Sequence, residues 1–368
     1  MIAPRLPDQI QASVFVAPKR PLELRSFPRP KLAAGETLVQ ITCCTLCGSD
    51  LHTYLGNRPG PAPSILGHES LGRIVEFGPG DPPRDGRGEP LSIDDRVSWS
   101  VAASCGDCFF CRHGLPQKCV RLFKYGHEAC CGDHPLSGGM AEFCHLAAGT
   151  TILPVPSEVP DLAAASASCA TATAAAALRT ASGCRGKTVL IQGAGLLGLT
   201  AAAMAHVEQA EHVIVADMDP QRLEKAGRFG ASAVVDVADG GRALDDVVRQ
   251  RTDGRGADVI IEMSGTAQAV QQGLTMLRTG GKYVLVGAVK PIGLIPLEIE
   301  QVVRRMWCIQ GVHNYAPVDL ATAIDFLAIN CQLFPFVDLV SGVFPLDDAD
   351  AAFQTMVETG AIRVAVRP

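Results

Sequence analysis

The sequence lacks the excess of positive charge that binding to nucleic acid requires. Its 368 residues include 32 Lys and Arg against 38 Asp and Glu, for a formal net charge of -6, and the basic residues are scattered along the chain. No basic stripe is therefore available to follow a phosphate backbone. We expect a small-molecule partner and no nucleic acid.

The sequence also lacks the long apolar runs of targeting and membrane-spanning segments. Pro4, Pro7 and Asp8 interrupt the stretch where a secretory signal would be apolar. The longest uncharged run, Leu162 to Leu178, is mostly Ala, Ser and Thr. These residues are too weakly apolar for a bilayer span and predict a buried helix. We expect a cytoplasmic protein that does not contact a membrane.

No internal repeat of about 20 to 50 residues is present, which disfavours a solenoid. A chain of 368 residues exceeds one ordinary core, so about two domains are expected. Residues 1–165 carry short β-type runs, such as Leu38 to Ile41 and Arg96 to Trp99, between Pro- and Gly-rich turns, which predicts a mostly β domain.

Residues 166–311 have a different pattern, in which apolar runs alternate with helical stretches. Continuous apolar strands predict a doubly wound parallel sheet with helices on both faces, an α/β domain. The strands are expected at Thr188 to Gln192, His212 to Asp217, Val259 to Met263, and Tyr283 to Val286. The last segment, 312–368, has a helix candidate at Val318 to Ile329 and a strand-like tail, Arg363 to Val366. It is too short for a core of its own, so it is expected to complete the first domain.

The 14 cysteines indicate metal sites and free thiols, because the cytosol keeps ordinary thiols reduced. Four of them follow the spacing C-x2-C-x2-C-x7-C, a pattern that suits a closed tetrahedral zinc site with a structural role. An iron–sulfur site fits less well, because its final gap is shorter and proline follows the last cysteine. The four are Cys105, Cys108, Cys111 and Cys119.

A second candidate metal site begins with Cys47 and His68, in Cys47-Gly48-Ser49-Asp50-Leu51-His52 and Gly67-His68-Glu69. A catalytic zinc needs about three protein ligands and one open position, and sulfur and nitrogen ligands suit it. A lone cysteine or histidine is more often part of an ordinary core. Their combination with the four-cysteine segment favours metal binding.

A glycine fingerprint, Gly193-Ala194-Gly195-Leu196-Leu197-Gly198, lies between a predicted strand and an apolar helix, where it predicts a dinucleotide pyrophosphate site. Asp217 ends the next strand, 24 residues after Gly193, where an acid would bind the ribose hydroxyls and repel a 2′-phosphate. NAD is therefore favoured. Arg222, a turn later, keeps NADP as an alternative.

These four motifs, in this order, resemble those of the zinc-containing medium-chain alcohol dehydrogenases over essentially the whole chain. The resemblance implies a GroES-like catalytic domain, a Rossmann domain and a homo-oligomer, either a dimer or a tetramer. It also implies two zinc ions, with Cys169 as the third catalytic ligand. The matching roles are Asp50 as the partner of His68, Glu69 as a carboxylate near the metal, and Ser49 and His52 as a proton route from the alcohol.

A narrower resemblance, to a bacterial branch associated with phosphonate catabolism, rests on Lys124-Tyr125-Gly126-His127-Glu128 and Gly311-Val312-His313-Asn314-Tyr315, among other segments. It implies a small hydroxyalkyl phosphonate, or its aldehyde, as the substrate. Such an anion requires cations in the pocket. Arg58, Lys124 and His127 are the candidates.

Two alternatives to a zinc-dependent alcohol dehydrogenase remain. One is a zinc-independent, NADP-linked reductase of the same superfamily, which would not need Cys47, His68 and Cys169 together. The other is a non-catalytic, NAD-binding redox sensor whose zinc is structural only. The zinc content per chain distinguishes the three hypotheses.

Overall fold

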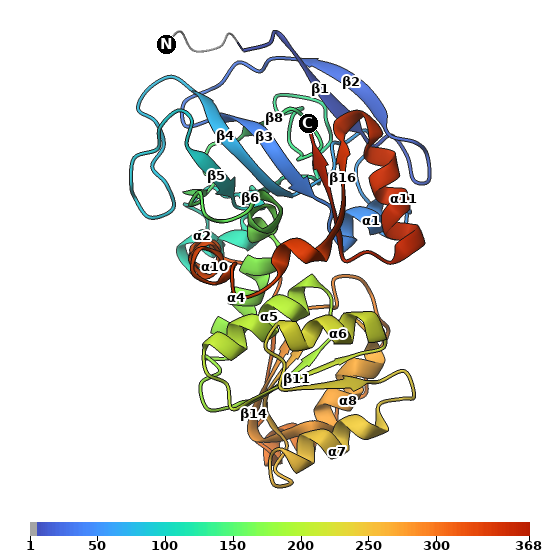
Figure 1. The fold of residues 1–368 in the computed structure, drawn as a ribbon. Helices are drawn as coiled ribbons and strands as arrows, with labels where there is room; N and C mark the ends of the chain where they lie inside the picture. The colour runs from blue at the N-terminus through green and yellow to red at the C-terminus, as the bar shows by residue number, and fades with distance from the viewer. Residues whose placement is uncertain (1–5) are drawn as a thin grey trace. The chain divides into compact units, whose positions relative to one another are not determined.

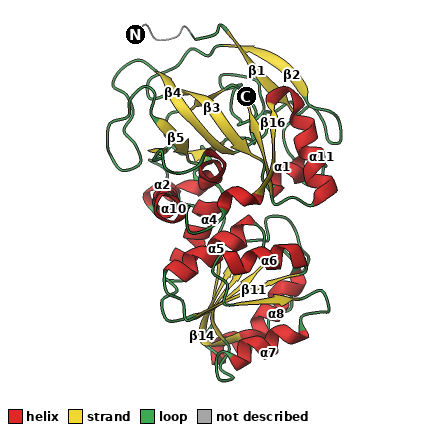
Figure 2. Ribbon diagram, in the orientation of Figure 1, coloured by secondary structure: helices red, strands yellow, loops and turns green. Residues whose placement is uncertain are grey.

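The computed structural model describes residues 6–368, which form two compact units (Figures 1 and 2). The predicted junctions were 165/166 and 311/312, and the structure places them at 169/170 and 315/316. It also places Gln332–Pro335 in the second unit, whereas we had assigned this segment to the first. The reason is a ring contact, because Phe334 stacks on Phe229 of the second unit with centroids 6.0 Å apart.

The second unit contains a six-stranded, wholly parallel sheet in the order β12-β11-β10-β13-β14-β15. Helices α5 and α6 cover one face, and α7 and α8 the other (Figure 1). The strands are β10 (Thr188–Gln192), β11 (His212–Asp217), β12 (Ala233–Asp236), β13 (Ala257–Glu262), β14 (Leu277–Leu285) and β15 (Cys308–Gly311). The helices are α4 (Ala170–Thr180), α5 (Leu196–Val207), α6 (Pro220–Arg228), α7 (Arg242–Gln250), α8 (Ala267–Met276) and α9 (Ile299–Arg304).

The predicted doubly wound sheet is therefore confirmed. Its central strands have apolar middles because helices cover both faces, and every residue of β10 is buried. β10 and β11 match their predicted bounds, β13 begins two residues earlier than predicted, and the expected last strand is the end of the longer β14. The strand order reverses between the neighbouring strands β10 and β13, and such sheets bind nucleotides at the carboxyl ends of the strands at this point.

The first unit is built on a seven-stranded sheet with the path β16-β17-β3-β4-β5-β9, to which β8 is added beside β3. Its strands are β3 (Thr37–Thr45), β4 (Glu69–Phe77), β5 (Arg96–Trp99), β8 (Phe143–Leu146), β9 (Ile152–Pro154), β16 (Val340–Pro345) and β17 (Arg363–Arg367). β17 pairs antiparallel with β3, so the C-terminal segment completes the first unit as expected.

Smaller elements surround this sheet (Figure 2). Two short pairs are β1 (Gln9–Val14) with β2 (Glu23–Pro28), and β6 (Ala102–Ala103) with β7 (Phe123–Lys124). The helices are α1 (Gly48–Tyr54), α2 (Phe109–Arg112), α3 (Asp161–Ala164), α10 (Pro317–Asn330) and α11 (Ala349–Thr359). α10 extends the predicted helix by one residue at each end.

The alanine-rich run 162–178 is largely buried, as predicted, but it is not one helix. α3 continues into a 3₁₀ turn, Ala165–Ser168, and α4 starts only after Cys169, whose φ of -137° and ψ of -79° are not helical. Local propensity predicted a continuous helix, and the structure interrupts it at a residue of the candidate site. Within residues 6–368, no single helix is long and apolar enough to cross a membrane; only the helical segments flanking Cys169 reach that length and composition jointly.

Candidate active site and metal centres

Cys47 and His68 lie at the same end of two neighbouring strands of the first unit, β3 and β4. β3 and β4 pair antiparallel, with Thr45 opposite Glu69, so β3 ends two residues before Cys47 and β4 starts one residue after His68. Cys47 then caps the N-terminus of α1. Two residues separated by 21 positions in the sequence are thus held side by side by strand register.

The third predicted ligand joins them at the interruption of the alanine-rich run. The ligand atoms of Cys47, His68, Cys169 and Glu69 all lie within 4.8 Å of one another. Two sulfurs, an imidazole and a carboxylate form a donor set that zinc accepts. His68 is 5% exposed and Glu69 is fully buried, whereas Cys47 and Cys169 are partly exposed. The residues present therefore fit a zinc ion.

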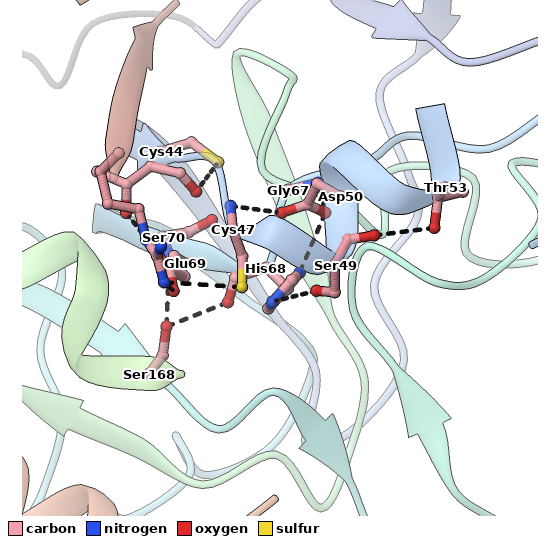
Figure 3. Close-up of polar contacts among 12 residues, drawn as sticks. Cys44, Cys47, Ser49, Asp50, Thr53, Gly67, His68, Glu69, Ser70 and Ser168 are labelled. Atoms are coloured by element: carbon pink, nitrogen blue, oxygen red, sulfur yellow. Dashed lines mark hydrogen bonds and ion pairs between the residues drawn. The ribbon is translucent and has the colours of Figure 1, made fainter. Parts of the chain in front are cut away.

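Asp50 orients His68, as the resemblance implied (Figure 3). Its Oδ1 accepts a hydrogen bond from His68 Nδ1 at 3.1 Å and one from the backbone N–H of Gly67 at 3.2 Å, while its Oδ2 accepts the N–H of Cys47 at 2.9 Å. The proton on Nδ1 leaves Nε2 of His68 as the free ligand atom. One buried carboxylate thus ties both ligand segments together.

Arg363, which the sequence analysis did not assign, binds both carboxylate oxygens of Glu69 beside the ligands. Its Nε and Nη2 each donate to one Glu69 oxygen at 2.9 Å, and Thr45 Oγ1 donates to Glu69 at 2.7 Å. Nη2 also lies 3.7 Å from the sulfur of Cys47. Burial disfavours the charged guanidinium, but Glu69 and Cys47 outweigh it and hold the pKa of Arg363 above its usual value. β17 carries an arginine at each end, and of the two Arg363 is buried and Arg367 is exposed.

The charges around the cluster favour a cation at its centre. A hydrogen bond from Cys169, with help from Arg363, lowers the pKa of Cys47 well below that of an ordinary thiol, and the same hydrogen bond raises the pKa of Cys169. Burial opposes the charging of His68, but Asp50 and Cys47 raise its pKa to about 10. The protons of the Cys169 thiol and of the His68 ring lie where a bound metal ion would take their place.

The two residues of the expected proton route both lie on α1. Ser49 Oγ is 3.5 Å from His68 Nε2, so its hydroxyl lies at the cluster. His52 follows one turn later and is half-buried, and its carbonyl accepts the N–H groups of Asn57 and Arg58. The structure thus brings Ser49 to the candidate metal site and places His52 farther along the same helix.

Three basic side chains lie near the ligands. The ring of His127 packs against that of His68, with centroids 5.1 Å apart and a tilt of 32°. Burial, followed by the charges of His68, Lys124 and Arg58, lowers the pKa of His127 and keeps it neutral. Burial and Arg58 also lower the pKa of Lys124. Within residues 6–368, neither the charged ends of Arg58 and Lys124 nor Nε2 of His127 has a hydrogen-bond or ion-pair partner.

The four-cysteine segment forms a compact lobe around α2. Its sulfur pairs are separated by 3.3 Å (Cys105–Cys119), 3.5 Å (Cys108–Cys111), 3.9 Å (Cys105–Cys111) and 4.0 Å (Cys108–Cys119). Thiolates on a tetrahedral zinc would be about 3.8 Å apart, from zinc–sulfur bonds of about 2.3 Å. Backbone N–H groups lower the pKa of Cys108 to about 6, which favours the thiolate that a metal binds. The lobe therefore fits a closed zinc site.

The glycine fingerprint and Asp217 lie at one cavity of the second unit. Gly193, Gly195, Asp217 and Arg222 line it, whereas Leu196, Leu197 and Gly198 do not. Gly193 has a φ of +109°, and a Cβ there would be 3.0 Å from the backbone N of Ser264. This is the tight turn that directs the N-terminus of α5 toward a ligand.

Asp217 is held in this cavity by backbone donors. Its oxygens accept the N–H groups of Ala194 and Asp219 at 2.5 and 2.9 Å. The Nε of Arg222 lies 3.4 Å from the carboxylate of Asp219. Sequence reasoning did not identify the wall formed by Met218, Met263, Ser264 and Thr266, because these residues follow other strands and carry no motif.

Comparisons with known proteins agree with this arrangement. Residues 33–157 match a family described as an alcohol dehydrogenase GroES-like domain, and residues 197–328 match a zinc-binding dehydrogenase family. The 5-exo-hydroxycamphor dehydrogenase of Pseudomonas putida is 30% identical over 360 residues, which cover 96% of each chain. The sorbitol dehydrogenase of Halalkalibacterium halodurans is 29% identical and covers 93% of this chain and 94% of its own. The crystal structure of an alcohol dehydrogenase from Thermotoga maritima has a TM-score of 0.92 and 31% identity, covering 98% of this chain and 99% of that one.

Proposed function

This chain belongs to the zinc-dependent medium-chain alcohol dehydrogenase family, and we propose that it interconverts a small alcohol and its aldehyde by hydride transfer to and from NAD. The observation that carries the proposal is the convergence of Cys47, His68 and Cys169 in one cluster. These three residues would hold the catalytic zinc. When bound, zinc supplies a Lewis acid that favours loss of the hydroxyl proton.

The chain's own groups supply the proton route and the orientation of the ligands. Ser49 Oγ, beside His68 Nε2, takes the proton of the alcohol, and His52 on the same helix passes it to solvent. Asp50 holds the ring of His68, and Arg363 keeps Glu69 paired. In this proposal the four-cysteine lobe holds a second zinc ion with a structural role, for two per chain.

The preference for NAD rests on Asp217. Its carboxylate lines the cavity beside the glycine turn, and its negative charge would repel the 2′-phosphate of NADP. Arg222 is a feature that favours NADP, and its Nε lies 3.4 Å from the carboxylate of Asp219. Steady-state assays with both cofactors test this preference; a higher kcat/KM with NADP would contradict it.

The proposed substrate carries an anionic group, with a hydroxyalkyl phosphonate as the specific candidate. The support is the set of basic side chains beside the ligands, Arg58, Lys124 and His127, whose polar ends have no partner in the described part of the chain. A phosphonate could accept hydrogen bonds from all three groups.

The test compares kcat/KM for 2-hydroxyethylphosphonate with that for a neutral alcohol in the wild type and in Arg58→Ala. We expect a loss of about 10- to 100-fold on the phosphonate alone, because a charge-assisted hydrogen bond is removed. Arg20→Ala, which removes an exposed arginine of the same unit, is the matched control. Equal losses on both substrates would contradict the proposed anion-binding pocket.

Metal analysis tests the wider proposal. A zinc-independent, NADP-linked reductase would leave the Cys47 cluster without zinc, and a non-catalytic sensor would hold zinc only in the four-cysteine lobe. Assembly as a dimer or tetramer in the cytoplasm belongs to the same proposal. Light scattering of the purified chain tests the assembly, and a monomer would contradict it.

A further inference from the structure

A third group of metal-binding side chains lies apart from both cysteine clusters. Glu36 directly precedes β3, and His145 lies on β8, whose residues pair with β3 so that Leu38 is opposite His145. His134 comes from the loop between β7 and β8. Three separate segments of the first unit thus bring two imidazoles and a carboxylate together, and nothing in the alcohol dehydrogenase reaction uses them.

The contacts within this group are short. Nε2 of His134 and Nε2 of His145 are each 2.8 Å from a different oxygen of Glu36, and the two rings stack with centroids 4.4 Å apart. One ligand atom from each residue lies within 4.8 Å of the other two. Glu36 is 7% exposed and His145 is 1% exposed, while the His134 side chain is 25% exposed.

We propose that Glu36, His134 and His145 form an exchangeable site for a divalent transition metal such as zinc. Two imidazole nitrogens and one carboxylate are a donor set that zinc uses in proteins when a coordination position is left open. Donors on a tetrahedral ion would be about 3.4 Å apart, from bonds of about 2.0 to 2.2 Å. The 2.8 Å contacts therefore have to widen by roughly half an ångström, which the partly exposed His134 allows.

Neighbouring groups support binding but limit its strength. The backbone N–H of Ala33 donates to Glu36 Oε2 at 2.7 Å and fixes the carboxylate. Nδ1 of His145 is buried, and no acceptor for it exists within residues 6–368. Binding through Nε2 places the ring proton on this Nδ1, where it stays unsatisfied. The ion should therefore exchange more readily than one held by four thiolates.

An ion here would fasten a loop that reaches the catalytic cluster. Gly126 N–H donates to the carbonyl of Ser137, and Gly139 N–H donates to that of Gly67, so the segment between them returns to the residue before His68. This segment carries both His127 and His134. Occupancy of the third site would hold it against β3 and β8 and should raise the melting temperature of the protein.

The test counts metal ions per chain after equilibration of the full-length protein with excess Zn²⁺, removal of free metal, and elemental analysis. We expect one ion more in the wild type than in His134→Ala or Glu36→Gln. Cys131→Ser, which removes an exposed donor from the same loop, is the control and should keep the extra ion. A mild chelator should remove this ion first.

The test compares the number of metal ions per chain in the wild type and in each variant. The expected difference of one ion does not depend on the metal occupancy of the two cysteine clusters. With Co²⁺, the extra equivalent should add visible absorption without the near-ultraviolet charge-transfer band of cobalt–thiolate bonds. His134 is partly exposed, whereas Glu36 is buried, so His134→Ala keeps the test valid if Glu36→Gln fails to fold. Equal ion counts in the wild type and His134→Ala would overturn the proposal.

Discussion

The two cysteine clusters of the first unit are built in opposite ways. The lobe takes its four sulfurs from 15 consecutive residues, Cys105 to Cys119, and three of the four cysteines are partly exposed. The candidate catalytic cluster takes its ligands from positions 47, 68 and 169; His68 is buried, and Cys47 and Cys169 are partly exposed. Backbone N–H groups contact the sulfurs of the lobe, whereas charged side chains, Asp50, Glu69 and Arg363, surround the ligands of the catalytic cluster.

We expect this difference to separate a site that only holds a metal from one that uses the metal in catalysis. Four thiolates complete a tetrahedral shell and leave no position for a substrate. Three ligands leave one position open, and the nearby carboxylate of Glu69 is held by Arg363. The buried cluster also depends on the whole fold, so changes there should affect catalysis and stability, while changes in the lobe should remain local.

The largest expected effect is that of Cys169→Ser on catalysis. Removal of a sulfur ligand should empty the buried site, and kcat/KM should fall by at least about 10,000-fold because the Lewis acid contributes several kcal/mol to the reaction. Metal analysis should show one zinc ion fewer while the lobe stays filled. Cys184→Ser, which changes a buried thiol outside both clusters, is the control. If the activity of Cys169→Ser stays within tenfold of the wild type, the buried site does not hold the metal that catalysis uses.

Arg363→Ala should produce the next largest effect, on folding. It leaves the fully buried Glu69 without its cation, and breaking a buried pair costs about 3 to 5 kcal/mol. Denaturant unfolding measures this loss. Replacing the pair together, by Arg363→Met with Glu69→Gln, should restore most of the stability, because no buried charge is then left alone. A loss below about 1 kcal/mol in Arg363→Ala would show that the pair is not buried as described.

Asp50→Asn should have an effect of intermediate size, on metal binding by the catalytic cluster. The change keeps the shape of the side chain but removes the negative charge that fixes His68, so affinity for the catalytic metal should fall by about 10- to 100-fold. Competition with a chelator measures this affinity. Asp107→Asn is the matched control, because Asp107 is an exposed acid beside the lobe that pairs with Arg121. If both variants lose metal equally, the proposed role of Asp50 is wrong.

The smallest effect on catalysis is expected from Cys111→Ser. The lobe should lose its ion and become more sensitive to proteolysis, but the kcat/KM of the folded enzyme should change by less than about threefold, since the two clusters share no ligand. Limited proteolysis and assays of the same preparation check both statements. A loss of activity as large as that of Cys169→Ser would show that the clusters are coupled.

The four-cysteine lobe and the catalytic cluster also differ in how far the sequence predicts them. The lobe was predicted from spacing alone, because its ligands are neighbours in the chain, and the parallel sheet was predicted from its apolar strands. The roles of Cys169 and Asp50 depended on the family resemblance, since nothing local marks either residue. Arg363 was missed for the same reason, because its partner Glu69 is 294 residues away.

The errors have local causes as well. Alanine has a high helix propensity, so the run 162–178 was predicted as one helix, although Cys169 interrupts it. His134 and His145 were not singled out, because they occur without a motif and meet Glu36 only through the pairing of β3 with β8. Long-range pairing of this kind is visible only in the folded chain.

The most direct test of the account is an anomalous difference map from crystals of the full-length protein, measured at the zinc absorption edge. The account predicts a strong peak bonded to the sulfurs of Cys47 and Cys169 and to Nε2 of His68, in addition to a peak in the four-cysteine lobe. A peak in the lobe with none between Cys47, His68 and Cys169 would contradict it.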